Sequence, residues 1–124
     1  MAGLHIGAPT PQSITVHGQS RVLEVGFSDG TSFRIPFELM RVYSPSAEVQ
    51  GHGPDQRVTV GGKAGVAIRD IVPVGHYAIR IVFDDGHDTG LFTWAYLATL
   101  GRERDERWQA YLDELRAKGL RRER

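Results

Sequence analysis

The 124-residue sequence contains no cysteine. This absence excludes disulfide bonds, zinc sites with thiolate ligands, iron–sulfur clusters held by cysteine, and cysteine nucleophiles. Any metal that the chain binds must therefore use histidine, carboxylate, backbone or water ligands.

An excess of charge of one sign is also lacking, because 15 Lys and Arg residues balance 15 Asp and Glu residues. This balance gives no electrostatic reason to expect a nucleic-acid or membrane partner. No apolar run reaches the length of about 18 residues that spans a bilayer, and the N-terminus has no basic region followed by an apolar run. We therefore expect a cytoplasmic protein that forms one domain.

Short alternating segments separated by turn residues predict antiparallel strands in most of the chain. We expect strands at residues 14–17, 22–27, 32–35, 58–60, 68–74 and 77–83. The Asp-Gly pairs at 29–30 and 85–86 are typical of tight hairpin turns. The fold class expected from this pattern is α+β, a small antiparallel β-sheet meander with a C-terminal helical segment packed on or beside it.

Helical signals are fewer. Residues 37–42 predict one or two helical turns, and residues 44–54 predict a loop. Thr93 is a suitable N-cap for a helix that ends at Leu100, with Gly101 as the terminating glycine. A second helix is expected at 102–118, with Trp108, Leu112 and Leu115 on one face.

A weak internal repeat is visible. Residues 27–30 followed by 37–39 resemble residues 83–86 followed by 94–97, and each copy runs strand, Asp-Gly turn, second strand and helical turn. We interpret the repeat as recurrence of a common supersecondary unit and not as a duplicated site.

The densest group of polar side chains is Asp84, Asp85, His87 and Asp88, which lie within one predicted turn. One interpretation is a metal site or a proton-transfer pair, because a neighbouring carboxylate orients imidazole and favours its charged form. The other is a polar turn in which the Asp side chains bond the local backbone. The residues taken alone favour the turn.

Two glycine-rich segments carry one basic or imidazole side chain each. His52 stands between Gly51 and Gly53, an arrangement that suits a ligand or surface contact and equally suits a mobile loop. Residues 61–65 predict either a phosphate-binding nest around Lys63 or a simple turn, and the turn is favoured. Trp94, Tyr96, Trp108 and Tyr111 are expected in the core rather than as a platform for stacked bases.

Two stretches of the sequence resemble a known family. Residues 77–101, and residues 39–49 leading into 51–54, resemble small bacterial proteins of the domain-of-unknown-function 971 (DUF971) family, which is grouped with the N-terminal domain of γ-butyrobetaine hydroxylase. The resemblance covers roughly residues 13–101, which we expect to form the domain. The glycines and prolines of residues 1–12 predict a leader, and residues 102–124 are expected to form a C-terminal helix with a basic tail.

The resemblance implies a small β-rich module with a structural zinc ion held by three cysteines and a histidine. Ser44, Ser46 and Val49 stand at the cysteine positions here, and His87 stands at the histidine position. Hydroxyl groups do not replace thiolates on zinc, so we expect the zinc to be lost. The resemblance does not extend to the oxygenase catalytic domain, so we do not expect hydroxylase activity.

Similar domains occur fused to P-loop ATPases that carry iron–sulfur clusters, which implies an accessory role near iron or iron–sulfur handling. Our leading hypothesis is a binding module that docks on a protein partner, such as an iron–sulfur carrier ATPase or an oxygenase, through a sheet edge or through residues 51–54. Its candidate binding residues are Gly51, Gly53, Asp84 and Trp94. A sharper version adds iron or another divalent metal, with ligands from His87, Asp85, Asp88 and His52.

Two alternatives stay open. One is a small metal-dependent enzyme centred on the turn that contains Asp84, His87 and Asp88. The other is nucleic-acid binding by the helix at 102–118, against which the neutral net charge argues. No Gly-x-Ser-x-Gly motif accompanies the serines at 44 and 46, so the sequence gives no signature of a serine nucleophile.

Overall fold

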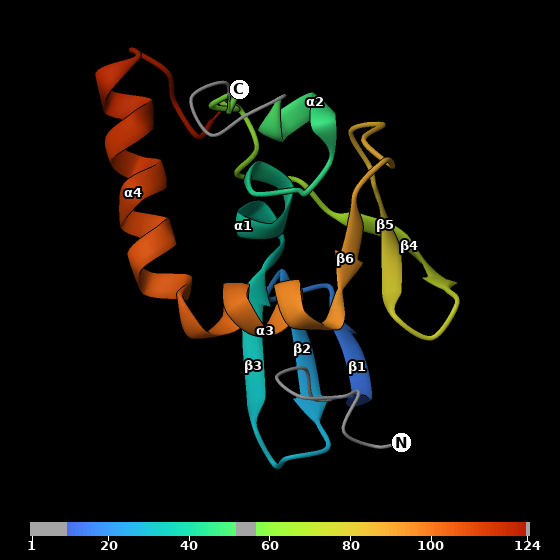
Figure 1. Cartoon of the computed structure of the whole chain (residues 1–124). Coiled ribbons are helices and arrows are strands. Elements are labelled where there is room, and N and C mark those ends of the chain that lie inside the picture. The colour runs from blue at the N-terminus through green and yellow to red at the C-terminus, as the bar shows by residue number, and fades with distance from the viewer. Residues whose placement is uncertain (1–9, 52–56, 124) are drawn as a thin grey trace.

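Two three-stranded antiparallel sheets form the body of the protein (Figure 1). The computed structural model describes residues 10–51 and 57–123. The first sheet contains β1 (Pro11–His17), β2 (Val22–Phe27) and β3 (Ser32–Pro36), and the second contains β4 (Ile68–Val74), β5 (Ala78–Phe83) and β6 (Leu91–Thr93). The sheets and the C-terminal helices confirm the expected α+β fold, although two small sheets replace a single meander.

The chain passes twice through the same local arrangement. Helix α1 (Phe37–Val42) follows β3, and helix α3 (Trp94–Arg102) follows β6, so each half is a three-stranded meander that ends in a helix. Two further helices in the described residues, α2 (Ala47–Gln50) and α4 (Arg104–Ala117), follow these units. The weak sequence repeat is therefore a repeated supersecondary unit.

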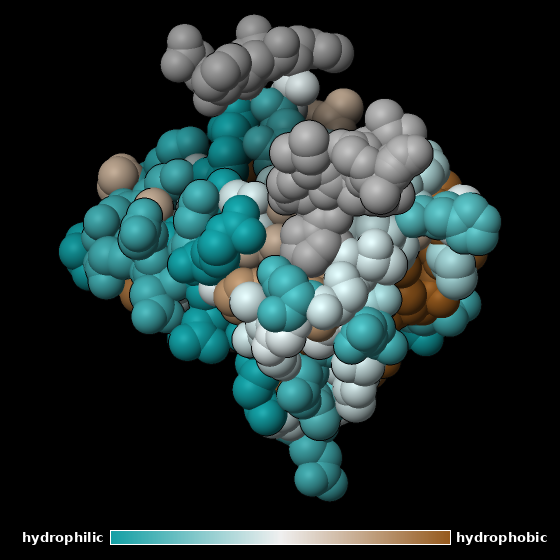
Figure 2. All heavy atoms as spheres, turned by 60° about the horizontal axis from the view of Figure 1, so that its bottom comes forward, coloured by the Kyte–Doolittle hydropathy of each residue, from teal (hydrophilic) through white to brown (hydrophobic). Residues whose placement is uncertain are grey.

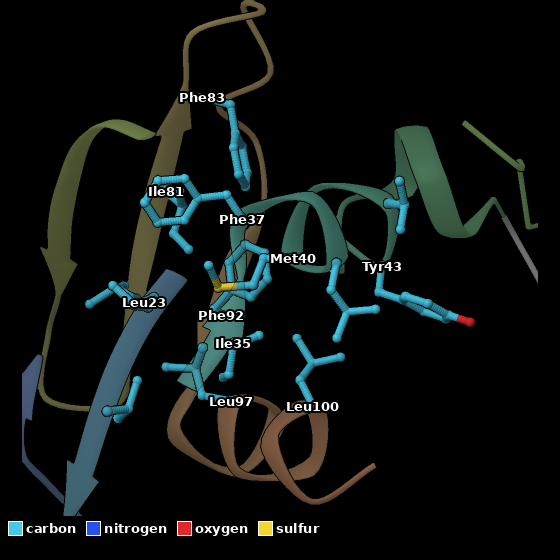
Figure 3. Close-up of a cluster of buried hydrophobic side chains, with 14 of the residues drawn as sticks. Leu23, Ile35, Phe37, Met40, Tyr43, Ile81, Phe83, Phe92, Leu97 and Leu100 are labelled. Carbon is cyan, nitrogen blue, oxygen red and sulfur yellow. The ribbon is translucent and has the colours of Figure 1, made fainter. Parts of the chain in front are cut away.

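The inner faces of the two sheets meet in one hydrophobic cluster (Figure 3). Alternation along β2 buries every second side chain, and the same period buries one face of β5. Helices α1 and α3 add Met40, Leu97 and Leu100 to the cluster. The labelled members in Figure 3 are Leu23, Ile35, Phe37, Met40, Tyr43, Ile81, Phe83, Phe92, Leu97 and Leu100.

Helix α3 begins as predicted and ends later than predicted. The Thr93 hydroxyl accepts a hydrogen bond from the Tyr96 amide at 3.1 Å, which confirms Thr93 as the N-cap. Gly101 was expected to end the helix, but α3 continues to Arg102. A Cβ at position 101 would overlap the Phe33 ring, so the glycine serves close helix–sheet packing instead of termination.

Three other boundaries differ from the sequence prediction. Residues 58–60 form no strand, and Val58 instead donates one backbone hydrogen bond to Val49. Residues 47–50 form α2 rather than loop, because the Ser46 hydroxyl accepts from the Glu48 amide and caps the helix. Strand β1 begins at Pro11, inside the segment predicted as a leader.

Helix α4 stands beside α1 and α3, away from β1 and β4 (Figure 1). Tyr111 of α4 is fully buried, and its hydroxyl donates to Glu38 of α1 at 2.7 Å. The Tyr43 hydroxyl donates to the Arg107 carbonyl of α4 at 3.0 Å. In the part of the chain that the structure describes, no helix has the length and apolar character needed to cross a bilayer.

Candidate functional site

The turn between β5 and β6 directs His87 into the protein. Gly86 has a φ of 91°, which only glycine adopts easily, and the His87 carbonyl accepts from the Phe83 amide at 3.0 Å. The His87 side chain is only 2% exposed. This turn is therefore the local reason why an imidazole lies inside the protein.

His87 is hydrogen-bonded to the segment that joins α1 and α2. Its Nε2 lies 2.8 Å from Ser44 Oγ, and its Nδ1 lies 3.5 Å from a carboxylate oxygen of Glu48. The other oxygen of Glu48 accepts from the Thr89 hydroxyl at 2.8 Å, and Thr89 also pairs with Ser46 at 2.7 Å. We call these five side chains the His87 network. It joins two segments more than 40 residues apart in sequence.

Burial lowers the pKa of His87 below its ordinary value of 6.5, and the nearby positive charge of Arg41 lowers this pKa further. The imidazole is therefore neutral at neutral pH. One ring nitrogen of a neutral imidazole donates and the other accepts, which suits one hydroxyl and one carboxylate partner.

Asp85 is the centre of a buried ion pair with two cations. Its Oδ2 lies 2.8 Å from Arg41 Nε and 2.6 Å from Lys63 Nζ, and its Oδ1 accepts from the His87 amide. Burial raises the pKa of Asp85, but the hydrogen bonds from Lys63, Arg41 and the His87 backbone outweigh it and lower this pKa from 3.8 to about 2. Asp85 is thus ionised and fully engaged.

The other two acids of the turn have different partners. Asp84 accepts from the Ala67 amide at 3.0 Å, which fixes the turn to the start of β4. The Asp88 side chain is 53% exposed, with one oxygen 3.6 Å from Arg80 Nη1. Across residues 10–51 and 57–123, no three His, Asp or Glu side chains are grouped so that they would hold a metal ion.

The predicted ligands His87, Asp85 and Asp88 are therefore close in sequence, but each side chain bonds to different partners. His52 and Gly53 lie outside the described residues, so their part in a metal or binding site stays a prediction. Gly51 is the C-cap of α2 with a φ of 67°, and its amide donates to Ala47. The turn interpretation is supported by Asp84 and Asp85, both of which bond backbone amides.

The residues at the family's zinc positions do not fit a zinc ion. Ser44 lies against His87, and its hydroxyl also accepts from the Ser46 amide at 3.3 Å. Glycine at position 90 leaves room for the Ser44 hydroxyl, because a Cβ at that position would overlap Ser44 Oγ. One imidazole, two hydroxyls and the buried alkyl side chain of Val49 do not make a tetrahedral zinc donor set. Hydrogen bonds join these segments instead.

Lys63 and its glycine neighbours do not form a free phosphate nest. The Lys63 amine is held by Asp85. The amides of Gly62 and Ala64 donate to the carbonyls of Arg121 and Arg122, so these two N–H groups are bonded within the chain.

An apolar groove, which sequence reasoning missed, lies between the edge strands β1 and β4. Ile14 pairs with Val25 and Val16 pairs with Leu23, so both β1 side chains lie on the inner face of their sheet. The same register places the apolar side chains of β4 on the inner face of the second sheet. Their faces line a groove of about 570 Å³, formed by Ile14, Val16, Ile68, Arg69, Asp70, Ile71, Pro73 and Ile79.

This edge groove is the open side of the two-sheet body. Helix α3 packs against β3 and β6 and covers the opposite side. Figure 2 shows hydrophobic side chains at the surface on the right, the side on which β1 and β4 lie in Figure 1. Val16 is 44% exposed although its side chain belongs to an inner face. The alternation in residues 14–17 was the available signal, but alternation alone does not show whether a face is covered.

Trp94 lies beside the edge groove. A second hollow of about 420 Å³ shares Ile14 with the groove and is bounded at its other end by His76 and Trp94. The Trp94 indole donates to the His76 carbonyl at 2.7 Å, which fixes the ring at the surface. Of the predicted binding residues, Trp94 is thus the one that borders this surface, whereas Asp84 lines a different hollow next to Lys63.

A family model matches most of the chain. The family model described as "gamma-butyrobetaine hydroxylase-like, N-terminal" matches residues 14–98, which run from within β1 through β6 to the first half of α3. No curated protein matches the chain.

Solved structures share the fold. One NMR solution structure is 44% identical with a TM-score of 0.81, covering 94% of this chain and 92% of that one. A second is 45% identical with a TM-score of 0.83, covering 94% and 87%. A crystal structure of a DUF971 protein of unknown function from Acidithiobacillus ferrooxidans is 42% identical with a TM-score of 0.63, covering 74% and 92%.

Proposed function

Because the chain belongs to the γ-butyrobetaine hydroxylase-like N-terminal family, which includes the DUF971 proteins, we propose that it is a binding module that docks on a protein partner through its edge groove. The observation that carries the proposal is the exposure of inner-face side chains, above all Val16, at the open side of the two-sheet body. An exposed patch of aliphatic side chains rimmed by polar residues is typical of an interaction site.

The occupant of the groove is an amphipathic helix of the partner. Addition of a strand is disfavoured, because the register of both β1 and β4 is broken by a bulge and Pro73 of β4 has no amide hydrogen to offer. Packed sheets lie about 10 Å apart, and a helix with side chains has a similar diameter. A helix that inserts apolar residues at intervals of three and four would fill the groove and leave both edges unchanged.

The rim of the groove carries one positive and one negative charge, Arg69 and Asp70, which cancel. The partner helix therefore has no need of net charge on its docking face, and affinity comes from burial of apolar area, at about 25 cal/mol per Å². Trp94 and His76 extend the contact surface beyond Ile14 and supply an aromatic anchor at one end.

The family suggests which partners to test first. Domains similar to this one occur fused to ATPases that carry iron–sulfur clusters, so the proposed partner is such a carrier or an oxygenase. In this proposal, the link to iron comes through the partner. The described ligands give no grouped metal site around His87, since Asp85 already holds two cations and Asp88 points to Arg80.

The test is a binding titration with a purified iron–sulfur carrier ATPase and three forms of this protein. Val16→Asp places a charge on the inner face of β1, whereas Thr15→Asp places the same charge one residue away on the outer face. The proposal expects Val16→Asp to weaken binding at least tenfold and Thr15→Asp to leave it within about twofold. Equal effects of the two variants would contradict docking in the groove, and self-association through the groove would appear as a dimer that Val16→Asp dissociates.

A further inference from the structure

The last residues of the described chain, 119–123, lie against the loop at residues 61–64. The amide of Gly62 donates to the Arg121 carbonyl at 2.8 Å, and the amide of Ala64 donates to the Arg122 carbonyl at 3.0 Å. A Cβ at Gly61 would lie 3.0 Å from the Arg121 carbonyl oxygen, so glycine at this position permits the close approach. The terminal segment is therefore bound through its backbone, as a peptide ligand would be.

The Arg122 side chain enters a pocket made for a guanidinium group. Its Nε and Nη2 donate to the two carboxylate oxygens of Glu38 at 2.9 and 2.8 Å, and the Glu38 side chain is only 6% exposed. The Tyr111 hydroxyl donates to the same carboxylate at 2.7 Å. The guanidinium carbon lies 5.1 Å from the centre of the Trp108 ring, within cation–π range.

We call Glu38, Trp108, Tyr111 and the amides of Gly62 and Ala64 the arginine pocket. Its chemistry selects arginine over lysine, because a planar fork fits a carboxylate in two places and stacks on an aromatic face, whereas an ammonium group is a point charge. The hydrogen bond to Glu38 raises the pKa of Arg122 above its already high ordinary value.

The pocket needs a cation, and the chain supplies Arg122, whose side chain stays 39% exposed. A buried carboxylate left without its partner is strongly unfavourable, so the Glu38 site is stable only when a guanidinium occupies it. The residues on either side of Arg122 are exposed, and Gly119, with a φ of 67°, joins the segment to α4. A further hollow of about 290 Å³ lies beside the guanidinium, bordered by Arg21 and Pro36, and leaves room for a larger ligand.

We propose that the arginine pocket is a recognition site for an extended, arginine-bearing segment of a partner protein, and that residues 119–123 are its resident ligand, which the partner displaces. This site shares no residue with the edge groove, and the proposal stands independently of the docking function. A tethered segment competes at an effective concentration of the order of millimolar, so a short free peptide of the same sequence binds visibly only when the resident is weakened.

The probe is the blocked peptide Gly-Leu-Arg-Arg-Glu, the sequence of residues 119–123, titrated into full-length Arg122→Ala. Amide and indole NMR signals are followed at Gly62, Ala64 and Trp108. The expected result is saturable binding at least tenfold tighter than to the unmodified protein. Addition of Glu38→Gln to the Arg122→Ala chain is expected to abolish it. Arg121→Ala, which changes an exposed neighbour, is the matched control and is expected to behave like the unmodified protein.

A second peptide, with citrulline in place of its second arginine, keeps the shape and loses the charge. Binding of this peptide as tight as that of the arginine peptide would overturn the proposal, and so would absence of any change at the three residues with millimolar arginine peptide. If Arg122→Ala does not fold, Arg122→Lys takes its place in the same titration, because lysine keeps a cation near Glu38 without the fork. In that case, the same two results would overturn the proposal.

Discussion

His87 Nε2 and Ser44 Oγ lie 2.8 Å apart, and both side chains are buried. The two residues come from the β5–β6 turn and from the segment after α1, and their hydrogen bond joins the two halves of the repeated architecture. At the positions where the related domain holds zinc, this protein holds the same segments together with a hydroxyl and an imidazole.

Removal of the Ser44 hydroxyl leaves a ring nitrogen of His87 buried without this partner. We expect Ser44→Ala to lower the free energy of unfolding by about 1–3 kcal/mol, the usual cost of an unsatisfied buried polar group. Urea denaturation measures this change. Ser32→Ala, at an exposed position of β3, is the control and is expected to change stability by less than about 0.5 kcal/mol. Equal effects of the two variants would show that the bond contributes nothing.

The lowered pKa of His87 predicts a loss of stability in mild acid. The unfolded chain takes up a proton near pH 6.5, whereas the folded protein resists protonation to a lower pH because its pKa is depressed. Stability from this group is therefore full above pH 6.5 and falls as the pH drops from 6.5 toward the folded pKa. His87→Gln is expected to flatten this part of the profile, as measured by urea denaturation at pH 7.5, 6.5 and 5.5. An unchanged slope in the variant would contradict the assignment.

Asp85 has the same sign of linkage as His87, but its pH window is lower. Its pKa is lowered from 3.8 to about 2, so its stabilisation is present above pH 3.8 and is lost as the pH falls toward 2. Asp85→Asn leaves Arg41 and Lys63 beside each other without their anion, and we expect it to cost about 3 kcal/mol at pH 7. Asp88→Asn, on an exposed side chain of the same turn, is expected to cost less than about 0.5 kcal/mol. Thermal unfolding of both variants measures the difference.

Restoring the thiolates tests the relation between the His87 network and the family's zinc site. We expect the variant Ser44→Cys, Ser46→Cys and Val49→Cys to bind one equivalent of zinc, because three thiolates and one imidazole form a complete tetrahedral donor set. Competition with a chromogenic chelator measures the affinity. The unmodified protein is expected to show no zinc-dependent shift of the His87 signals, and the triple variant that also carries His87→Gln is expected to bind zinc more weakly. Saturable zinc binding by the unmodified protein at His87 would contradict the interpretation of His87 as a structural residue.

The strand and hairpin order was predictable because it depends on local chemistry. Alternation at residues 22–27 and the Asp-Gly turns determine β2, the hairpins and the β5–β6 turn without reference to distant residues. The end of α3 was not predictable in this way. Gly101 looks like a helix terminator, and only the packing of Phe33 against it reveals the reason for the glycine.

Local sequence patterns also could not predict which distant residues bond to the side chains of the candidate site. The sequence shows Asp84, Asp85, His87 and Asp88 as one cluster, but the partner of Asp85 is 44 residues away at Arg41, and that of His87 is 43 residues away at Ser44. Two clues pointed to this outcome. The Asp-Gly turn predicted that the carboxylates would bond the backbone, and the family resemblance placed Ser44 and His87 at equivalent ligand positions.

The edge groove is the central element of the proposed function, and site-specific photo-cross-linking tests it most directly. A photoreactive phenylalanine analogue is placed at position 16, on the inner face of β1, or at position 15, on the outer face. The account predicts that position 16 captures one specific partner protein in cells, that position 15 does not, and that Ile71→Asp across the groove abolishes the capture. Capture of the same protein from position 15, or capture at position 16 that survives Ile71→Asp, would contradict the account.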